Sequence, residues 1–151
     1  MSRKLLFVLA DGGRVRFVER SQSSGHFATF EEIDRTQALS ELRTELRASP
    51  PARTHASASP RRSAVGREDY LRPAKEAFMA EVAARAAALV RERKLDGVFL
   101  AAPPQLITPL RARLDGAAPL AGAIRKDLTK TPDHELGVWL SGIHTSLSPS
   151  P

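Results

Sequence analysis

The chain has no cysteine among its 151 residues, so it forms no disulfide bond and offers no thiolate to a metal ion or a substrate. Aromatic side chains are also few, with six Phe, one Trp and one Tyr. Because single-stranded nucleic acid stacks its bases on exposed aromatic rings, we do not expect sequence-specific recognition of single strands. No apolar run approaches the ~20 residues that a membrane span needs, so we expect none.

The start of the chain imitates a signal peptide without meeting its requirements. A basic pair precedes an apolar run over residues 5–10. That run is shorter than the ~7–15 apolar residues of a signal, and it stops at a turn sequence. We therefore expect a cytoplasmic protein.

Positive charge is in excess. Lys and Arg number 23 against 17 Asp and Glu, which gives a formal net charge of +6 and a pI near 10.5. Such a balance favours polyanionic partners, although it does not bear on the fold. The length, with 42% hydrophobic and 26% charged residues, is typical of one globular domain.

The strongest local signal is a hairpin turn at Asp11-Gly12-Gly13. It joins the apolar run 5–10 to a segment that alternates apolar and charged residues, as a half-buried strand does. Asp and Gly accept the positive φ that tight hairpins require. A third strand over 27–33 completes an antiparallel meander, and a short helix or an ordered loop follows over 34–46.

Residues 48–66 change in composition to Ala, Ser, Pro, Thr and Arg, with no acidic residue. Such a segment buries no core, so we predict a mobile basic loop. Arg61, Arg62 and Arg67 contribute to its charge. Two interpretations remain open: a solvated linker, or an arm for phosphate or acidic surfaces, since Arg pairs with phosphate through two hydrogen bonds.

The second half of the chain alternates helical patterns with apolar strands. Pro73 is tolerated in the first turn of a helix, which places the start of a long helix just before it. Strands joined through a helix run parallel. We predict, in chain order, a long helix from about residue 68, a buried strand over 98–102, a helix over 105–114, a strand over 120–124, a helix over 131–140 and a disordered tail over 143–151.

Four separated segments together resemble, in the right order, the bacterial host-attachment protein family. The segments are residues 8–17, 67–68, 98–104 and 126–136, and the resemblance that they carry extends over nearly the whole chain. The resemblance implies a domain over 1–142 of the α/β class, with a ribonuclease-H-like mixed sheet of about five strands, an antiparallel meander followed by parallel strands, and packed helices. The motif residues are Asp11, Gly12, Gly13, Pro103, Pro104, Asp127, Thr129, His134 and Glu135.

The family takes its name from a member implicated in bacterial attachment to host cells. It has also been grouped with bacterial relatives of the archaeal and eukaryotic release-factor domain, which implies a ribosome-associated role. The Gly-Gly-Gln triplet that release factors use is absent, and the nearest string is Gly12-Gly13-Arg14. We therefore do not expect the chain to release peptides from tRNA.

No catalytic motif is present. His134-Glu135 begins like a zinc-protease motif, but Val138 stands where the second His is required. The four histidines lie in separate segments without ligand spacing, so we expect neither a metal ion nor a cofactor. The chain also lacks a Gly-x-Ser-x-Gly elbow and a Walker A string.

A metal-dependent nuclease remains an alternative, because nucleases on a ribonuclease-H-like sheet bind two metal ions through carboxylates at strand ends. The available acids are Asp11, Asp96, Asp127 and Asp133. For three of them the local structure already accounts for an acidic residue: Asp11 lies in a turn, Asp96 in a loop before a Gly, and Asp133 at a helix start. Only Asp127 has no such explanation.

We therefore expect a non-catalytic binding protein whose partner is the ribosome or another RNA-containing surface. An indirect role in attachment to host cells is the second alternative. Arg14 and Arg16 qualify as anion contacts only if they face the same side as Arg125 and Lys126. The candidate contacts are Arg14, Arg16, Arg61, Arg62, Arg67, Arg125, Lys126 and Lys130.

Overall fold

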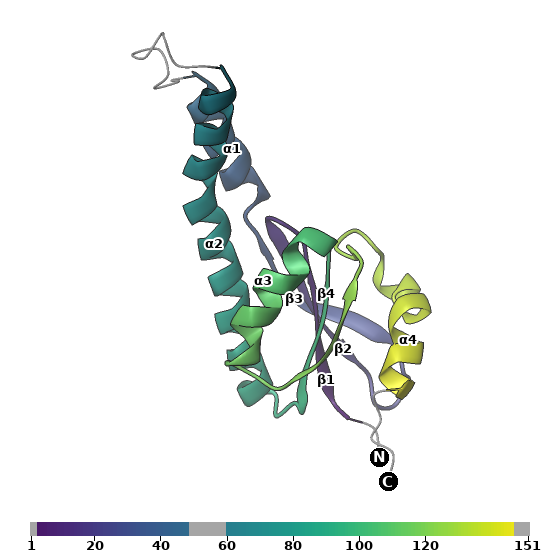
Figure 1. Cartoon of the computed structure of the whole chain (residues 1–151). Coiled ribbons are helices and arrows are strands. Elements are labelled where there is room, and N and C mark those ends of the chain that lie inside the picture. The colour runs from purple at the N-terminus through teal and green to yellow at the C-terminus, as the bar shows by residue number, and fades with distance from the viewer. Residues whose placement is uncertain (1–2, 49–59, 147–151) are drawn as a thin grey trace.

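A mixed sheet of five strands runs through the molecule, and helices cover both of its faces (Figure 1). The computed structural model describes residues 3–48 and 60–146, without the side chains of residues 48, 60–69 and 142–146. In chain order the strands are β1 (Leu5–Ala10), β2 (Arg14–Arg20), β3 (Phe27–Asp34), β4 (Gly97–Ala102) and β5 (Leu120–Arg125). They lie in the order β3-β2-β1-β4-β5.

The first three strands form the predicted antiparallel meander, and β4 and β5 run parallel to β1. This confirms the single-domain α/β class and the mixed sheet of five strands. It also agrees with the strand arrangement that the resemblance implies. β1 lies at the centre because all six of its residues are apolar and buried, and β4 beside it is equally buried.

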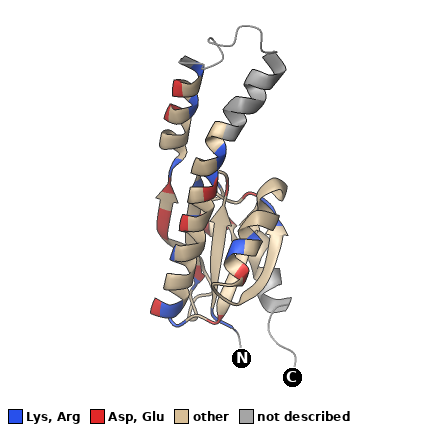
Figure 2. Ribbon diagram, turned by 60° about the vertical axis from the view of Figure 1, so that its left-hand side comes forward, with Lys and Arg blue, Asp and Glu red and all other residues tan. Residues whose placement is uncertain are grey.

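The helices within the described residues are α1 (Thr36–Ala48), α2 (Pro60–Glu92), α3 (Pro104–Asp115) and α4 (Gly137–Ser146), with a short 3-10 turn, η2 (Asp133–Glu135). Successive side chains of a strand point to opposite faces, so β1 contributes to two cores. Leu6 and Val8 pack with α2 and α3 on one face, whereas Phe7 and Leu9 pack with α4 on the other. α1 projects beyond the sheet beside α2 (Figures 1 and 2).

α2 begins earlier than the sequence predicts. Its first residue is Pro60, so residues 60–66 of the expected basic loop belong to the helix, and residues 49–59 lie outside the described part. Pro73 therefore lies inside α2, and its placement in the first turn was wrong. A proline removes one backbone hydrogen bond, and the flanking Ala, Arg and Glu residues have high helix propensity.

The chain end also differs from the prediction. A single helix over 131–140 was expected, but η2 and α4 share this region, and α4 continues to Ser146. Residues 143–146 of the expected tail are thus helical, while residues 147–151 lie outside the described part. Pro132 is extended and precedes η2.

The hairpin between β1 and β2 forms where it was predicted, but for a different reason. Among the described glycines only Gly25 has positive φ, so neither Gly12 nor Gly13 supplies it. Asp11 closes the turn instead, because its Oδ1 accepts the backbone N–H of Gly13 at 2.9 Å and of Arg14 at 2.8 Å. A Cβ on Gly13 would lie 3.0 Å from the Leu39 side chain, so this glycine permits the close approach of α1.

Candidate functional site

The carboxyl ends of the three parallel strands meet at one edge of the sheet, where α/β proteins commonly bind ligands. Asp11 follows β1, Pro103 follows β4, and residues 126–136 follow β5. We call residues 126–136 the motif loop. This loop passes from β5 toward β3, whose residues contact η2. The edge therefore brings together three of the four segments that carry the family resemblance.

Arg16 on β2 fixes the motif loop to the sheet. The residue is only 6% exposed. Its guanidinium donates to the carbonyl oxygens of Leu128 at 2.9 Å and Thr131 at 2.5 Å, and to Thr29 Oγ1 at 3.0 Å. It also donates to Asp133 Oδ1 at 2.6 Å. Arg16 is therefore satisfied by the protein itself, which differs from its predicted use as an anion contact.

Asp133 receives a second set of donors from β3. The hydroxyl of Thr29 donates to Oδ1 at 2.6 Å, and its backbone N–H donates to Oδ2 at 3.0 Å. Burial acts to raise the pKa of Asp133, but the hydrogen bonds from Thr29 and Arg16 outweigh it and hold that pKa below its usual range. The ionised carboxylate is thus part of the fold.

A second polar cluster joins the hairpin turn to the motif loop through Thr129, which is 2% exposed. Its Oγ1 lies 2.6 Å from Asp127 Oδ1 and 3.2 Å from Asp11 Oδ2. A hydroxyl carries one proton, so the shorter contact identifies Asp127 as the main acceptor. The same Oδ1 accepts the Thr129 backbone N–H at 2.9 Å. Asp127, unexplained by its local sequence, therefore closes a turn.

An open hollow of ≈ 520 Å³ lies between the motif loop and strands β2 and β3. Arg14 and Lys130 are cations at this hollow that take no part in holding the motif loop to the sheet. Arg14 lies 3.8 Å from the carboxylates of both Glu32 and Asp34, which is beyond hydrogen-bond distance. The residues that line the hollow are Arg14, Arg16, Thr29, Glu32, Thr129, Lys130, Thr131, Pro132 and Asp133.

The buried Nε of Arg14 has no hydrogen-bond partner among the described residues. The side chain as a whole is about one-third exposed. Part of the guanidinium is therefore reachable from the hollow, where Lys130 is exposed at the rim. The carboxylates of Glu32 and Asp133 line the same hollow as the two cations, so the hollow has mixed charge.

The remaining predicted cations lie elsewhere. Arg125 and Lys126 are exposed after β5 but do not line the hollow. Lys126 Nζ lies 4.6 Å above the ring of Trp139 in α4, within cation–π distance. The side chains of the three predicted arginines at the start of α2 lie outside the described residues; they are Arg61, Arg62 and Arg67.

The structure also locates the other motif residues, and two of them have a clear structural role. The Pro103 carbonyl accepts the backbone N–H groups of Leu106 and Ile107 in α3, and Pro104 occupies the helix start, where its missing N–H costs nothing. His134 and Glu135 lie in η2, and the His134 side chain is exposed, as predicted. Within residues 3–48 and 60–146, no group of three or more His, Cys, Asp or Glu is placed to hold a metal ion.

Thr29 is the site residue that the sequence did not identify. It lies inside β3, and nothing in its local pattern distinguishes it from any other strand Thr. Its contact with Asp133 joins residues 104 positions apart. Only the pairing of β3 with β2, which places Thr29 opposite Val18, brings it beside Arg16.

The fold and this edge define a single-domain α/β protein whose motif loop is held to a mixed sheet by one buried arginine. Residues 6–140 match a family described as "Protein required for attachment to host cells", and the chain belongs to this family. The predicted membership is therefore confirmed. No curated protein matches the chain significantly. In the part of the chain that is described, no helix is long and apolar enough to cross a membrane.

Proposed function

We propose that the chain is a non-catalytic binding protein, and that its partner is the ribosome or another RNA-containing surface. The observation that carries this proposal is the position of Arg14 and Lys130 at the open hollow on the carboxyl edge of the sheet. Neither is used to hold the motif loop. Phosphate groups are the natural ligands of such cations, since each contact releases condensed counterions.

Binding is favoured over catalysis by the tasks that the polar motif residues already perform. Arg16 and Asp133 hold the motif loop, and Asp11 and Asp127 each close a turn. These side chains are engaged in the folded protein. The family's pattern therefore has a structural explanation that requires no reaction.

RNA is favoured over other polyanions by the net charge of +6 and by the grouping of this family with release-factor-like proteins. Arg125 and Lys126 are exposed and add positive charge outside the hollow. Among the described residues the exposed aromatic side chains are Tyr70 and Trp139. Contacts to phosphate, which position a protein without reading sequence, suit this surface better than base stacking does.

Co-sedimentation with ribosomal subunits in sucrose gradients, at two salt concentrations, tests the proposal. We expect binding that weakens as salt rises. Lys130→Gln should reduce the slope of log K against log salt by about 0.7–0.9, the value of one phosphate contact. Arg111→Gln is the matched control, because Arg111 is exposed on α3 and does not line the hollow.

Three results would contradict the proposal: no binding at low salt, binding that does not depend on salt, or an equal effect of both substitutions. The last result would assign the binding to net charge alone.

A second candidate function is an indirect role in attachment to host cells, which the family match over residues 6–140 favours. A strain lacking the gene should attach less to cultured host cells, and the wild-type gene should restore attachment. Complementation with the Lys130→Gln gene links the two candidates, since it should fail if attachment depends on the hollow. Normal attachment of the deletion strain, with unchanged surface composition, would rule this role out.

A further inference from the structure

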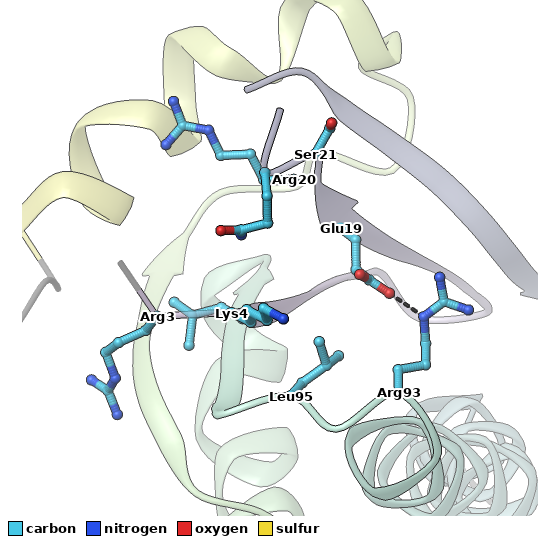
Figure 3. Close-up of a pocket in the computed structure, with 9 residues that line it drawn as sticks. Arg3, Lys4, Glu19, Arg20, Ser21, Arg93 and Leu95 are labelled. Atoms are coloured by element: carbon cyan, nitrogen blue, oxygen red, sulfur yellow. Dashed lines mark hydrogen bonds and ion pairs between the residues drawn. The ribbon is translucent and has the colours of Figure 1, made fainter. Parts of the chain in front are cut away.

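A second hollow lies at the opposite edge of the sheet from the motif loop, where β1 begins and β2 ends (Figure 3). Its volume is ≈ 190 Å³. The turn between α2 and β4 closes one side of it. The lining residues are Arg3, Lys4, Leu5, Glu19, Arg20, Ser21, Gln22, Arg93 and Leu95.

This hollow is strongly basic. Four of its lining side chains are cationic and one is a carboxylate. Within the described residues no ion pair engages Arg3, Lys4 or Arg20, and Glu19 pairs with Arg93. Figure 3 shows the Lys4 ammonium directed toward the Glu19–Arg93 pair, while the guanidinium groups of Arg3 and Arg20 point away from that pair. The lining cations therefore outnumber the one carboxylate, and Lys4 and Arg93 are the two that lie beside it.

Two of the cationic groups are held in place by neighbouring rings. The guanidinium of Arg93 lies 3.9 Å from the centre of the Phe30 ring, while its Nε donates to Glu19. Arg20 donates from Nε to the Gly25 carbonyl at 3.0 Å and lies over the ring of Phe27. The terminal nitrogens of Arg93 have no hydrogen-bond partner among the described residues, so they remain as donors at the hollow.

The backbone at Lys4 is anchored as well. Its N–H donates to Asp96 Oδ2 at 2.7 Å, and its carbonyl accepts the Asp96 N–H at 2.7 Å. Besides Glu19, the negative charges near the hollow are the Asp96 carboxylate and the partial negative charge at the carboxyl end of α2. Lys4 thus starts from a fixed backbone, which lowers the entropy cost of holding a ligand.

We propose that this hollow binds the phosphate group of a small molecule, either inorganic phosphate or a compact phosphate monoester. Its volume falls below the roughly 300–1,000 Å³ of pockets that enclose a whole drug-sized ligand, so it fits a head group. A phosphate ester carries about −1.5 to −2 charges at pH 7, which the cationic surplus neutralises. Guanidinium groups suit its oxygens, and the Gln22 amide among the lining residues is a neutral donor.

Titration of the ¹⁵N-labelled chain with inorganic phosphate, followed by amide NMR shifts, tests this proposal. We expect saturable shifts at Leu5, Arg20 and Leu95. Lys4→Gln should raise the Kd about tenfold, the effect of losing one charged contact of 1.4 kcal/mol. Arg111→Gln removes one positive charge on α3, where it lines neither hollow, and should leave the Kd unchanged, so this test is independent of RNA binding.

A parallel titration with glycerol phosphate distinguishes the two sources of the phosphate group. Tighter binding of glycerol phosphate identifies a monoester as the ligand, and tighter binding of inorganic phosphate identifies the free ion. The proposal is overturned if neither probe gives saturable shifts, or if Lys4→Gln leaves both Kd values unchanged. An equal loss of affinity in Arg111→Gln would also overturn it, because the effect would then come from net charge.

Discussion

Arg16 and Asp133 lie 117 residues apart in the chain, and the guanidinium of the first donates to the carboxylate of the second at 2.6 Å. The contact joins strand β2 to the motif loop, which carries the last of the four family segments. Because Arg16 also donates to two carbonyl oxygens of that loop, it fixes backbone as well as charge. The shape of the adjoining hollow, and hence the placement of Lys130, depends on this arginine.

Replacing Arg16 with Met should lower the free energy of unfolding by about 2–4 kcal/mol. The substitution leaves the Asp133 carboxylate without its cation and removes donors from buried carbonyl oxygens. Urea denaturation measures the change. Arg14→Met is the matched control on the same strand, and it should cost about 0–1 kcal/mol because its ion pairs are long and partly exposed. Equal losses in the two variants would contradict the role assigned to Arg16.

The stability contributed by Asp133 should depend on pH. Its folded-state pKa is lowered, so the contribution is complete above the pKa of the unfolded chain, about 3.9, and is lost as pH falls through the lower folded value. The difference in unfolding free energy between wild type and Asp133→Asn should therefore shrink below about pH 4. Urea denaturation from pH 7 downward measures it. A difference that stays constant over this range would contradict the prediction.

Much of the fold follows from local sequence patterns. The runs that form β1 and β4 are apolar throughout, which predicts central strands buried on both faces, and the structure confirms this. The start of α2 was missed because Pro73 was treated as a first-turn residue. The free-energy cost of one proline in a helix is outweighed by a long stretch of residues with high helix propensity. The proline alone does not reveal this, because it depends on the residues on both sides.

The candidate site was less predictable, because its contacts are long-range. Arg16 alternates with the buried residues Val15 and Phe17, which indicates a strand but not which face is covered. That the motif loop covers this face depends on β5 ending next to β4, and no local pattern contains that information. No local explanation was found for Asp127, although an Asp side chain often accepts the backbone N–H two residues on, as it does here from Thr129.

Gly97 and Gly116 offer a matched pair for testing the packing of β4. A Cβ on Gly97 would lie 2.9 Å from the Pro119 carbonyl oxygen, which accepts the Val98 N–H. Gly97→Ala should therefore lower the free energy of unfolding by about 1–3 kcal/mol. Gly116→Ala meets no atom within 4 Å and should be neutral or slightly stabilising. Thermal unfolding measures both, and a neutral Gly97→Ala would contradict the packing.

Asp11 and Asp127 test whether the chain cleaves RNA. They converge on Thr129 at strand ends, the position that metal-dependent nucleases on such sheets use. Asn at either position keeps an Oδ1 acceptor for the turn, so both variants should fold. Because the proposed function is binding, we expect wild type, Asp11→Asn and Asp127→Asn to leave labelled RNA equally intact with Mg²⁺. Mg²⁺-dependent cleavage by wild type that Asp127→Asn abolishes, and Lys130→Gln retains, would replace the binding proposal with a nuclease.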